Sequence, residues 1–168
     1  HVATAAASVN PPLEMAWVKN IGANIYMTSP LVYNGMIYVA SVDENLQGDA
    51  HIYALNGQTG ELLWKYQTRN SIKNTIAIDN GRVLAQDAQG YLYAVDAQSG
   101  KLSWEKQLPV AGLQSLIEGM VASDGVVYAG TGNGLCEIAT KDGREIWSTK
   151  DWGQGEGTNT NLSVGQNM

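Results

Sequence analysis

The acidic segment 43–49 has the residue types that come closest to a cation site in this chain. Asp43, Glu44 and Asp49 place three carboxylates within seven residues, and hard cations such as Ca²⁺ prefer oxygen ligands of this kind. Their spacing nevertheless departs from that of an EF-hand loop. We therefore interpret the segment as a solvated loop, with a cation site as the alternative.

Other patterns that carry catalytic chemistry are incomplete. The two histidines, His1 and His51, and the single cysteine, Cys136, have no spacing that suits zinc. One cysteine also excludes an intrachain disulfide. The sequence contains neither the nucleophile elbow Gly-x-Ser-x-Gly nor a phosphate-binding P-loop. We assign no catalytic residue to the chain and expect no cofactor.

A tryptophan that follows a glycine by four residues occurs three times in the chain. This repeat indicates which secondary-structure elements must position any functional site. The pairs are Gly60 with Trp64, Gly100 with Trp104, and Gly143 with Trp147. Successive tryptophans lie 40 and 43 residues apart, and Trp17 precedes the first pair by 47 residues. A period of about 40–45 residues with an aromatic signature is typical of a β-propeller. We expect these tryptophans and glycines to be structural contacts between blades.

Each repeat divides into four short strands separated by turn signals. Asn-Gly or Asp-Gly dipeptides, which favour tight hairpins, end at Gly35, Gly81 and Gly125. The middle strands are continuous apolar runs, such as Leu92-Tyr-Ala-Val95, which predicts that both of their faces are covered. The predicted fold class is therefore all-β: a partial β-propeller of four-stranded antiparallel blades, with three whole blades and two part blades.

The repeat also predicts the domain organisation. We expect a linker over residues 1–12 and a partial propeller over residues 13–168. The whole blades are expected at about 24–68, 69–109 and 110–151, and the part blades at 13–23 and 152–168. An open half ring would leave blade faces and strand edges bare. We therefore expect either self-association of two half rings or a second half of the ring elsewhere in a longer protein. A chain that begins at His1 is expected to have been processed or cut from such a protein.

Composition narrows the classes of partner. The net charge of −6 is spread without runs of one sign, which argues against a nucleic-acid-binding surface. No apolar stretch approaches the ~18 residues that a membrane span requires. Few lysines together with many glycines and asparagines are compatible with an exported bacterial protein, in the periplasm or at the cell surface.

The windows 54–64 and 94–104 read Ala-x-Asn/Asp-x-x-Thr/Ser-Gly-Glu/Lys-x-x-Trp. This pattern resembles the tryptophan-docking motif of the pyrroloquinoline quinone (PQQ)-like repeat propellers. Window 137–147 keeps only the glycine, the basic residue after it and the tryptophan. The resemblance implies an eight-bladed parent. Such propellers occur in quinoprotein alcohol and sugar dehydrogenases, in a periplasmic scaffold that helps to insert outer-membrane β-barrels, and as appendages of other enzymes.

The resemblance implies a metal candidate only for the dehydrogenase class. Those enzymes carry adjacent cysteines beside the quinone and a Ca²⁺ site, whereas this chain has only Cys136, which we expect in the core. The stretch Tyr128-Ala-Gly-Thr-Gly-Asn133 resembles the segment in which alcohol-oxidising quinoproteins place a Ca²⁺-ligating asparagine. Asn133 is thus the metal candidate. An ordinary turn is the alternative, because Asn133-Gly134 aligns with Gln89-Gly90 of the preceding repeat.

Binding in a propeller is expected on one rim, where the loops between blades meet the turns after the second strands. The polar candidates on this rim are Arg69, Lys73, Asn74, Gln114, Glu118, Asp43, Glu44 and Asn133. Segment 109–113 and the pair Tyr26-Met27 would add apolar surface. The alternative for each of these residues is a solvated loop position.

These observations favour a non-catalytic propeller module for protein–protein interaction or scaffolding in an exported bacterial protein. One alternative is a fragment of a quinoprotein dehydrogenase that depends on PQQ and Ca²⁺. Another is a propeller appended to a different enzyme, such as a hydrolase. A protein partner is expected under the favoured interpretation.

Overall fold

Three four-stranded antiparallel sheets form the computed structural model, which describes residues 11–26, 28–45, 47–109, 119–132, 134–149 and 162–164. Blade 1 comprises β1 (Leu31–Tyr33), β2 (Met36–Ala40), β3 (His51–Asn56) and β4 (Leu62–Gln67). Blade 2 comprises β5 (Ala77–Asp79), β6 (Arg82–Gln86), β7 (Tyr91–Asp96) and β8 (Leu102–Gln107). Blade 3 comprises β9 (Met120–Ser123), β10 (Val126–Gly130), β11 (Leu135–Ala139) and β12 (Glu145–Thr149). The described residues contain strands and no helices, which confirms the predicted all-β fold.

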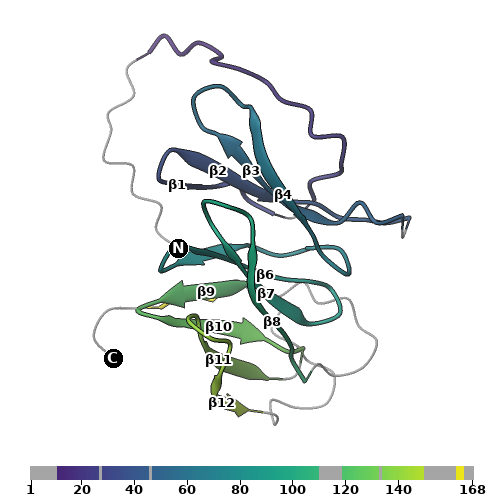
Figure 1. Cartoon of the computed structure of the whole chain (residues 1–168), viewed down its shortest axis with the longest axis vertical. Coiled ribbons are helices and arrows are strands. Elements are labelled where there is room, and N and C mark those ends of the chain that lie inside the picture. The colour runs from purple at the N-terminus through teal and green to yellow at the C-terminus, as the bar shows by residue number, and fades with distance from the viewer. Residues whose placement is uncertain are drawn as a thin grey trace.

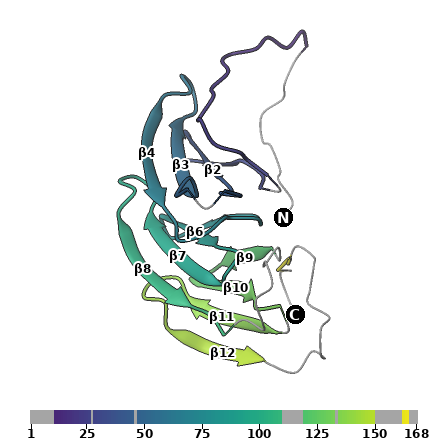
Figure 2. The same ribbon diagram turned by 90° about the vertical axis from the view of Figure 1, so that its right-hand side faces the viewer.

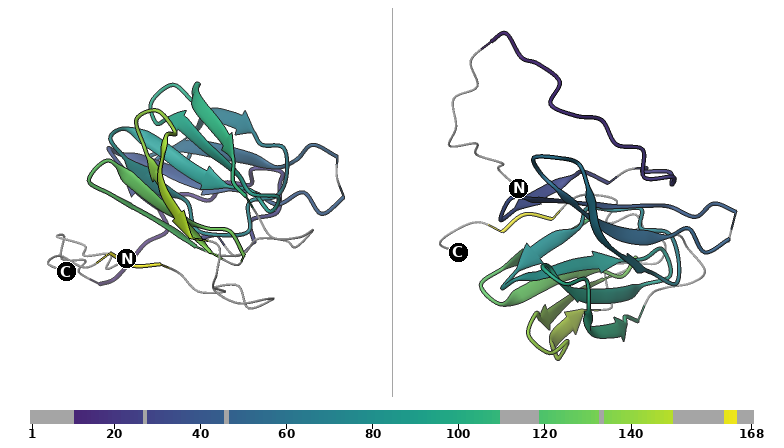
Figure 3. Two further views of the ribbon diagram at one scale, coloured as in Figure 1. Left: turned by 90° about the horizontal axis from the view of Figure 1, so that it is seen from below. Right: turned by 45° about the horizontal axis from the view of Figure 1, so that its top comes forward.

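The strands of each blade are hydrogen-bonded in chain order, and the blades follow one another through the molecule. Figure 1 shows blade 1 uppermost, blade 2 in the middle and blade 3 below. In Figure 2 the fourth strands β4, β8 and β12 lie along one side of the molecule. The loop between β2 and β3 extends beyond its sheet (Figure 3, right). The three sheets are whole blades of a propeller that does not close within the described residues.

Tight hairpins join the first two strands of each blade, as the Asn-Gly and Asp-Gly dipeptides predict. Asn34, Asn80 and Asp124 have φ values of 49°, 46° and 54°, and the glycine after each is also left-handed. Two successive left-handed residues are the requirement of a type I′ turn, whose twist matches that of the flanking strands. The dipeptides therefore mark the hairpin between the first and second strands of each blade.

The core consists of two layers of buried side chains, one on each side of blade 2. Tyr93 and Val95 of β7 pack with residues of blade 1, whereas Leu92 and Ala94 of the same strand pack with residues of blade 3. The alternation follows from the two-residue period of a strand, which sends successive side chains to opposite faces. Cys136 is fully buried in the second layer.

The tryptophans join successive blades through one repeated contact. The indole Nε1 donates from Trp17 to the carbonyl of Gly57 (3.1 Å), from Trp64 to that of Ala97 (3.0 Å), and from Trp104 to that of Thr140 (2.9 Å). In each case the acceptor lies three residues before the glycine that the ring covers. The covered glycines are Gly60, Gly100 and Gly143, respectively. Trp147 differs from the others, because it is 41% exposed and its ring contacts Tyr128 of its own blade.

The turns that carry these glycines are closed by the same backbone bonds in all three blades. The N–H of each of these covered glycines donates to the carbonyl four residues earlier, at 2.8–2.9 Å. The Asn56 and Asp96 side chains add bonds to N–H groups inside their turns. Ala139 cannot do so, and the sequence therefore predicts a looser third turn. The structure nevertheless shows the same backbone closure there, because Gly143 still donates to Ala139 at 2.9 Å.

Candidate functional site

A hollow of about 500 Å³ lies between blades 1 and 2, where the loop after β2 meets the segment that leaves β4. Its lining combines charged, aromatic and amide groups. The lining residues are Asp43, Gly48, Tyr66, Gln67, Thr68, Arg69, Tyr93 and Glu105. Of the predicted rim residues it contains Arg69 and Asp43. Glu44, Lys73 and Asn74 do not line it.

The other sequence candidates separate into two groups. Lys73 is partly exposed, Glu44 is exposed, and Asn74 lies buried at 2% exposure rather than on the rim surface. Neither the side-chain oxygen nor the side-chain nitrogen of Asn74 has a hydrogen-bond partner among the described residues. Asn133, Glu118, Gln114, Met27 and residues 110–113 lie outside the described part of the chain.

Asp43 organises the loop after β2. Backbone N–H groups of residues 47–49 donate to its carboxylate at 2.6–3.2 Å. These bonds, that of Gln47 above all, hold the pKa of Asp43 below its usual value, because they stabilise the charged form. The carboxylate is thus a turn cap that keeps its negative charge. Among the residues that the structure describes, no group of three or more acidic, histidine or cysteine side chains is arranged to hold a metal ion.

Arg69 crosses from blade 1 to blade 2 at the edge of the hollow. Its Nη2 donates to Oε1 of Glu105 on β8, and its guanidinium carbon lies 4.6 Å from the centroid of the Tyr91 ring. The hydrogen bond to Glu105 is the main reason that the pKa of Arg69 is raised. Because the Arg69 side chain is 54% exposed, the ion pair is screened by water and adds little stability. It does fix where the positive charge stands.

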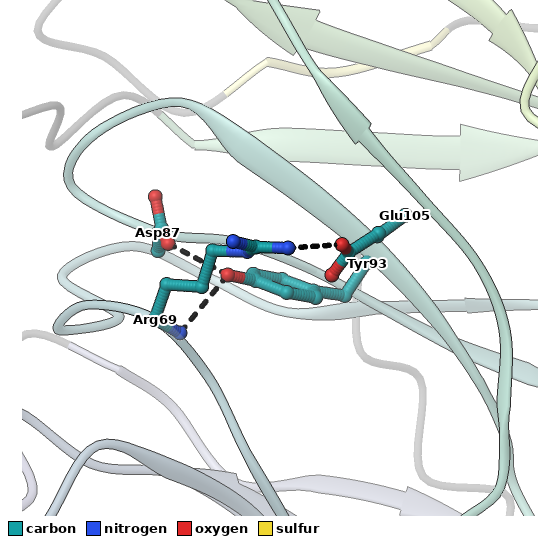
Figure 4. A network of polar contacts seen from close by, with 4 residues as sticks. All are labelled: Arg69, Asp87, Tyr93 and Glu105. Atoms are coloured by element: carbon teal, nitrogen blue, oxygen red, sulfur yellow. Dashed lines mark hydrogen bonds and ion pairs between the residues drawn. The ribbon is translucent and has the colours of Figure 1, made fainter. Parts of the chain in front are cut away.

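Beneath Arg69, the Tyr93 hydroxyl ties the two blades together (Figure 4). It donates to Oδ2 of Asp87 at 2.8 Å and accepts the backbone N–H of Arg69 at 3.0 Å. Burial raises the pKa of Tyr93 and also that of Asp87. Asp87 is stabilised in this position by the backbone N–H groups of Gln89 and Tyr91 as well. Tyr93 is therefore a neutral donor with a fixed hydroxyl.

The segment between β4 and β5 is held across the turns of both blades. The Asp43 N–H donates to Oγ of Ser71 at 2.8 Å, and the Ala88 N–H donates to the Ser71 carbonyl at 2.8 Å. The Ile72 N–H in turn donates to the carbonyl of Ser41 at 3.1 Å. These bonds hold the segment that follows Arg69 against both blades, so the backbone beside the hollow is already ordered.

Sequence reasoning missed the aromatic wall and the acidic partner of this hollow. Tyr66, Tyr93 and Glu105 lie on strands rather than rim loops, and they belong to two different blades. A signal for Tyr66 was nevertheless available. Tyr66 follows Trp64 by two residues, and alternate residues of a strand share a face. The structure agrees, because Trp64 and Tyr66 are the partly buried residues of β4.

The fold and the tryptophan–glycine contact repeated between blades define the class of protein: a partial β-propeller whose repeats resemble those of the PQQ-like propellers. Residues 14–74 match the family model described as outer membrane protein assembly factor BamB. Together with the solved structures below, this match confirms the resemblance to PQQ-like repeat propellers. No curated protein matches the chain. The described residues contain no helix that is long and apolar enough to cross a membrane.

Solved structures of two kinds share the fold. A europium-containing methanol dehydrogenase superposes with a TM-score of 0.66 at 20% identity, over 80% of this chain and 26% of its own. The quinohemoprotein alcohol dehydrogenase of Comamonas testosteroni gives 0.63 at 20% identity, over 76% of this chain and 21% of its own. BamB from Moraxella catarrhalis gives a TM-score of 0.64 at 17% identity, over 80% of this chain and 39% of its own. The chain spans less than half of each structure, and at these identities the likeness defines the fold.

Proposed function

We propose that this chain is a non-catalytic protein-binding module whose contact surface includes the hollow between blades 1 and 2. The observation that supports the proposal is the meeting of the exposed Arg69 guanidinium with the partly exposed Tyr66 ring in that hollow. Arginine and tyrosine are enriched among the few residues that dominate the free energy of protein–protein binding. The hydrogen-bonded segment beside the hollow lowers the ordering cost that association carries.

The comparison with the assembly-factor family supports the same proposal. Six of the eight lining residues fall within the matched residues 14–74. We propose by analogy that the partner is another exported protein and that the chain acts in the periplasm or at the cell surface. No cofactor is required for this role.

A dehydrogenase segment is the second candidate, and the similar alcohol- and methanol-oxidising structures favour it. The described residues fit PQQ and Ca²⁺ poorly. Cys136 is buried between blades, and the Asp43 carboxylate is committed to its own loop. We therefore expect no rise in the melting temperature of the complete protein when PQQ and Ca²⁺ are added together. A rise that requires both would favour the dehydrogenase, because a ligand stabilises the state that binds it.

Photo-cross-linking tests the protein-binding role directly. Gln67 is exposed and lines the hollow, so a photoreactive amino acid at position 67 of the complete protein is expected to capture one discrete partner in the native host. Its position at the hollow places the reactive group within the proposed interface. The readout is a cross-linked band whose partner is identified by mass spectrometry.

The matched control is the same photoreactive residue at position 98. Gln98 is also exposed, but it lies in the turn between β7 and β8, at the opposite end of the strands from the hollow. We expect no cross-link above background there. Equal capture from both positions, or none from position 67, would contradict the proposal.

A further inference from the structure

We propose that the face of blade 3 turned away from blade 2 is an interaction surface, and that a further blade covers it with a basic side chain against Glu137. This surface is separate from the hollow, so the inference goes beyond the function proposed above. Its side chains include Tyr128 of β10, Leu135 and Glu137 of β11, and Trp147 of β12. Trp147 is 41% exposed, and the other three are partly exposed. No blade follows blade 3 among the described residues.

The two-residue period of the strands assigns these side chains to one face. Cys136 and Ile138 of β11 are fully buried in the core layer between blades 2 and 3. Glu137 lies between them in the chain and therefore belongs to the opposite face. In the register of the sheet, Glu137 pairs with Tyr128 on one side and with Trp147 on the other. Residues that pair directly across a sheet share a face, so all three side chains belong to this surface.

The same register position is occupied by alanine in the two blades whose faces are covered. Ala54 pairs with Trp64 in blade 1, and Ala94 pairs with Trp104 in blade 2. Both alanines are fully buried, the first between blades 1 and 2 and the second between blades 2 and 3. In blade 3 the residue that pairs with the tryptophan is Glu137. The third repeat thus has a carboxylate where the first two have a small apolar side chain.

The contact repeated between blades indicates what covers this face. The side chains that cover a blade come from the second and third strands of the next blade, such as Val83 and Tyr93 over blade 1 and Val127 and Ile138 over blade 2. The tryptophan of the covered blade also lies over a glycine of the next blade. Trp147 has the same place in β12 but covers no glycine among the described residues. A further blade would complete both contacts.

The carboxylate decides the chemistry of that blade. Burial of an unpaired carboxylate is costly, so a covering sheet must bring a partner for it. No ion pair joins Glu137 to a lysine or arginine among the described residues. Glu137 does lie near the Tyr128 hydroxyl, whose pKa is raised by burial and then by the charge of Glu137. Residues 151–168 contain no lysine, arginine or histidine, so the basic side chain is expected on the second or third strand of a blade that extends beyond them.

A second copy of this chain fits the face poorly. Two copies joined through this face would bring two Glu137 carboxylates together, and like charges disfavour such a contact. In a head-to-tail pair, Trp147 would need the covered glycine of blade 1. That glycine, Gly60, is already covered by Trp17 of its own chain. The surface therefore suits a blade of different sequence.

Substitutions of Glu137 in the complete protein test the charge. Glu137→Gln keeps the size of the side chain and removes its charge, so we expect the melting temperature to fall by a few degrees because the cation opposite is left unpaired. Glu137→Ala restores the residue found in blades 1 and 2, and it should lower the melting temperature as well. Glu44→Gln, at an exposed glutamate in the loop after β2, is the matched control and should leave the melting temperature unchanged.

Two further measurements locate the covering blade. A photoreactive phenylalanine derivative in place of Tyr128 should cross-link within the complete protein to a segment outside residues 1–168 that contains a lysine or arginine. Mass spectrometry of the digested protein identifies that segment. In protein labelled with fluorotryptophan, the Trp147 signal, assigned with Trp147→Phe, should show the small solvent isotope shift of a covered ring.

Each measurement has a result that would overturn the inference. A higher melting temperature in Glu137→Ala would mean that an apolar sheet covers the face, as in blades 1 and 2. An unchanged melting temperature in Glu137→Gln would show that no cation meets the carboxylate. A Trp147 signal with the solvent shift of an exposed indole, or the failure of position 128 to cross-link outside residues 1–168, would exclude the further blade. Cross-linking from position 67 is independent of these results, so the protein-binding role is tested separately.

Discussion

Replacement of Gly100 by alanine is expected to lower the free energy of unfolding by about 3 kcal/mol. Gly100 has a φ of +71°, and a Cβ atom there would lie 2.7 Å from Cδ2 of Trp64. A left-handed residue with a side chain costs roughly 1–2 kcal/mol, and overpacking a fixed ring costs roughly 1–3 kcal/mol more. The ring cannot move aside cheaply, because its Nε1 is bonded to the carbonyl of Ala97 at 3.0 Å. Urea unfolding followed by tryptophan fluorescence measures the loss.

Gly81→Ala is the matched control for this substitution. Gly81 has the same φ of +71°, but nothing lies within 4 Å of the position that its Cβ would take. It should therefore show only the backbone cost, roughly 1–2 kcal/mol. The difference between the two variants isolates the contact between blades. Equal losses would show that Gly100 is needed only for its backbone conformation.

The contact between blades could be predicted from the sequence because its signature is a short motif that repeats along the chain. The turn glycine and the next tryptophan stand four residues apart in every copy. The ring covers the glycine of the following repeat, so Trp64 lies over Gly100 and Trp104 over Gly143. The hairpin dipeptides are equally local, since both residues must be left-handed. A pattern that depends on neighbours in the chain needs no knowledge of the packing.

The hollow could not be predicted in this way, because packing between blades decides it. Arg69 was expected on the rim, but nothing near it in sequence indicates that it pairs with Glu105, 36 residues later. Asn74 is polar, as Arg69 is, and it was also expected on the rim. It is buried instead, two residues after Ile72, whose side chain lies in the core. The carboxylate of Asp43 is a suitable ligand for a cation, but backbone N–H groups of its own loop donate to both of its oxygens. Residue type alone does not distinguish these outcomes.

Replacement of Trp104 by alanine is expected to cost about 3 kcal/mol of unfolding free energy and to weaken the junction between blades 2 and 3. Truncation of a buried tryptophan typically costs about 3–5 kcal/mol, and the lower end applies because Trp104 is only partly buried. The ring packs over Gly143 and against the second core layer, and its Nε1 donates to the Thr140 carbonyl at 2.9 Å. Its loss removes both the apolar contact and the hydrogen bond. Hydrogen exchange of the amides in β10 and β11 would report a loosened blade 3.

Trp104→Phe separates the two contributions. Phenylalanine keeps an aromatic ring over Gly143 but has no N–H to donate, so the Thr140 carbonyl loses its indole partner. One such hydrogen bond contributes about 1 kcal/mol, and the smaller ring loses some contact as well. We therefore expect a loss between that of the alanine variant and that of the unchanged protein. A phenylalanine variant as unstable as the alanine variant would mean that the hydrogen bond, rather than the packing of the ring on glycine, holds adjacent blades together.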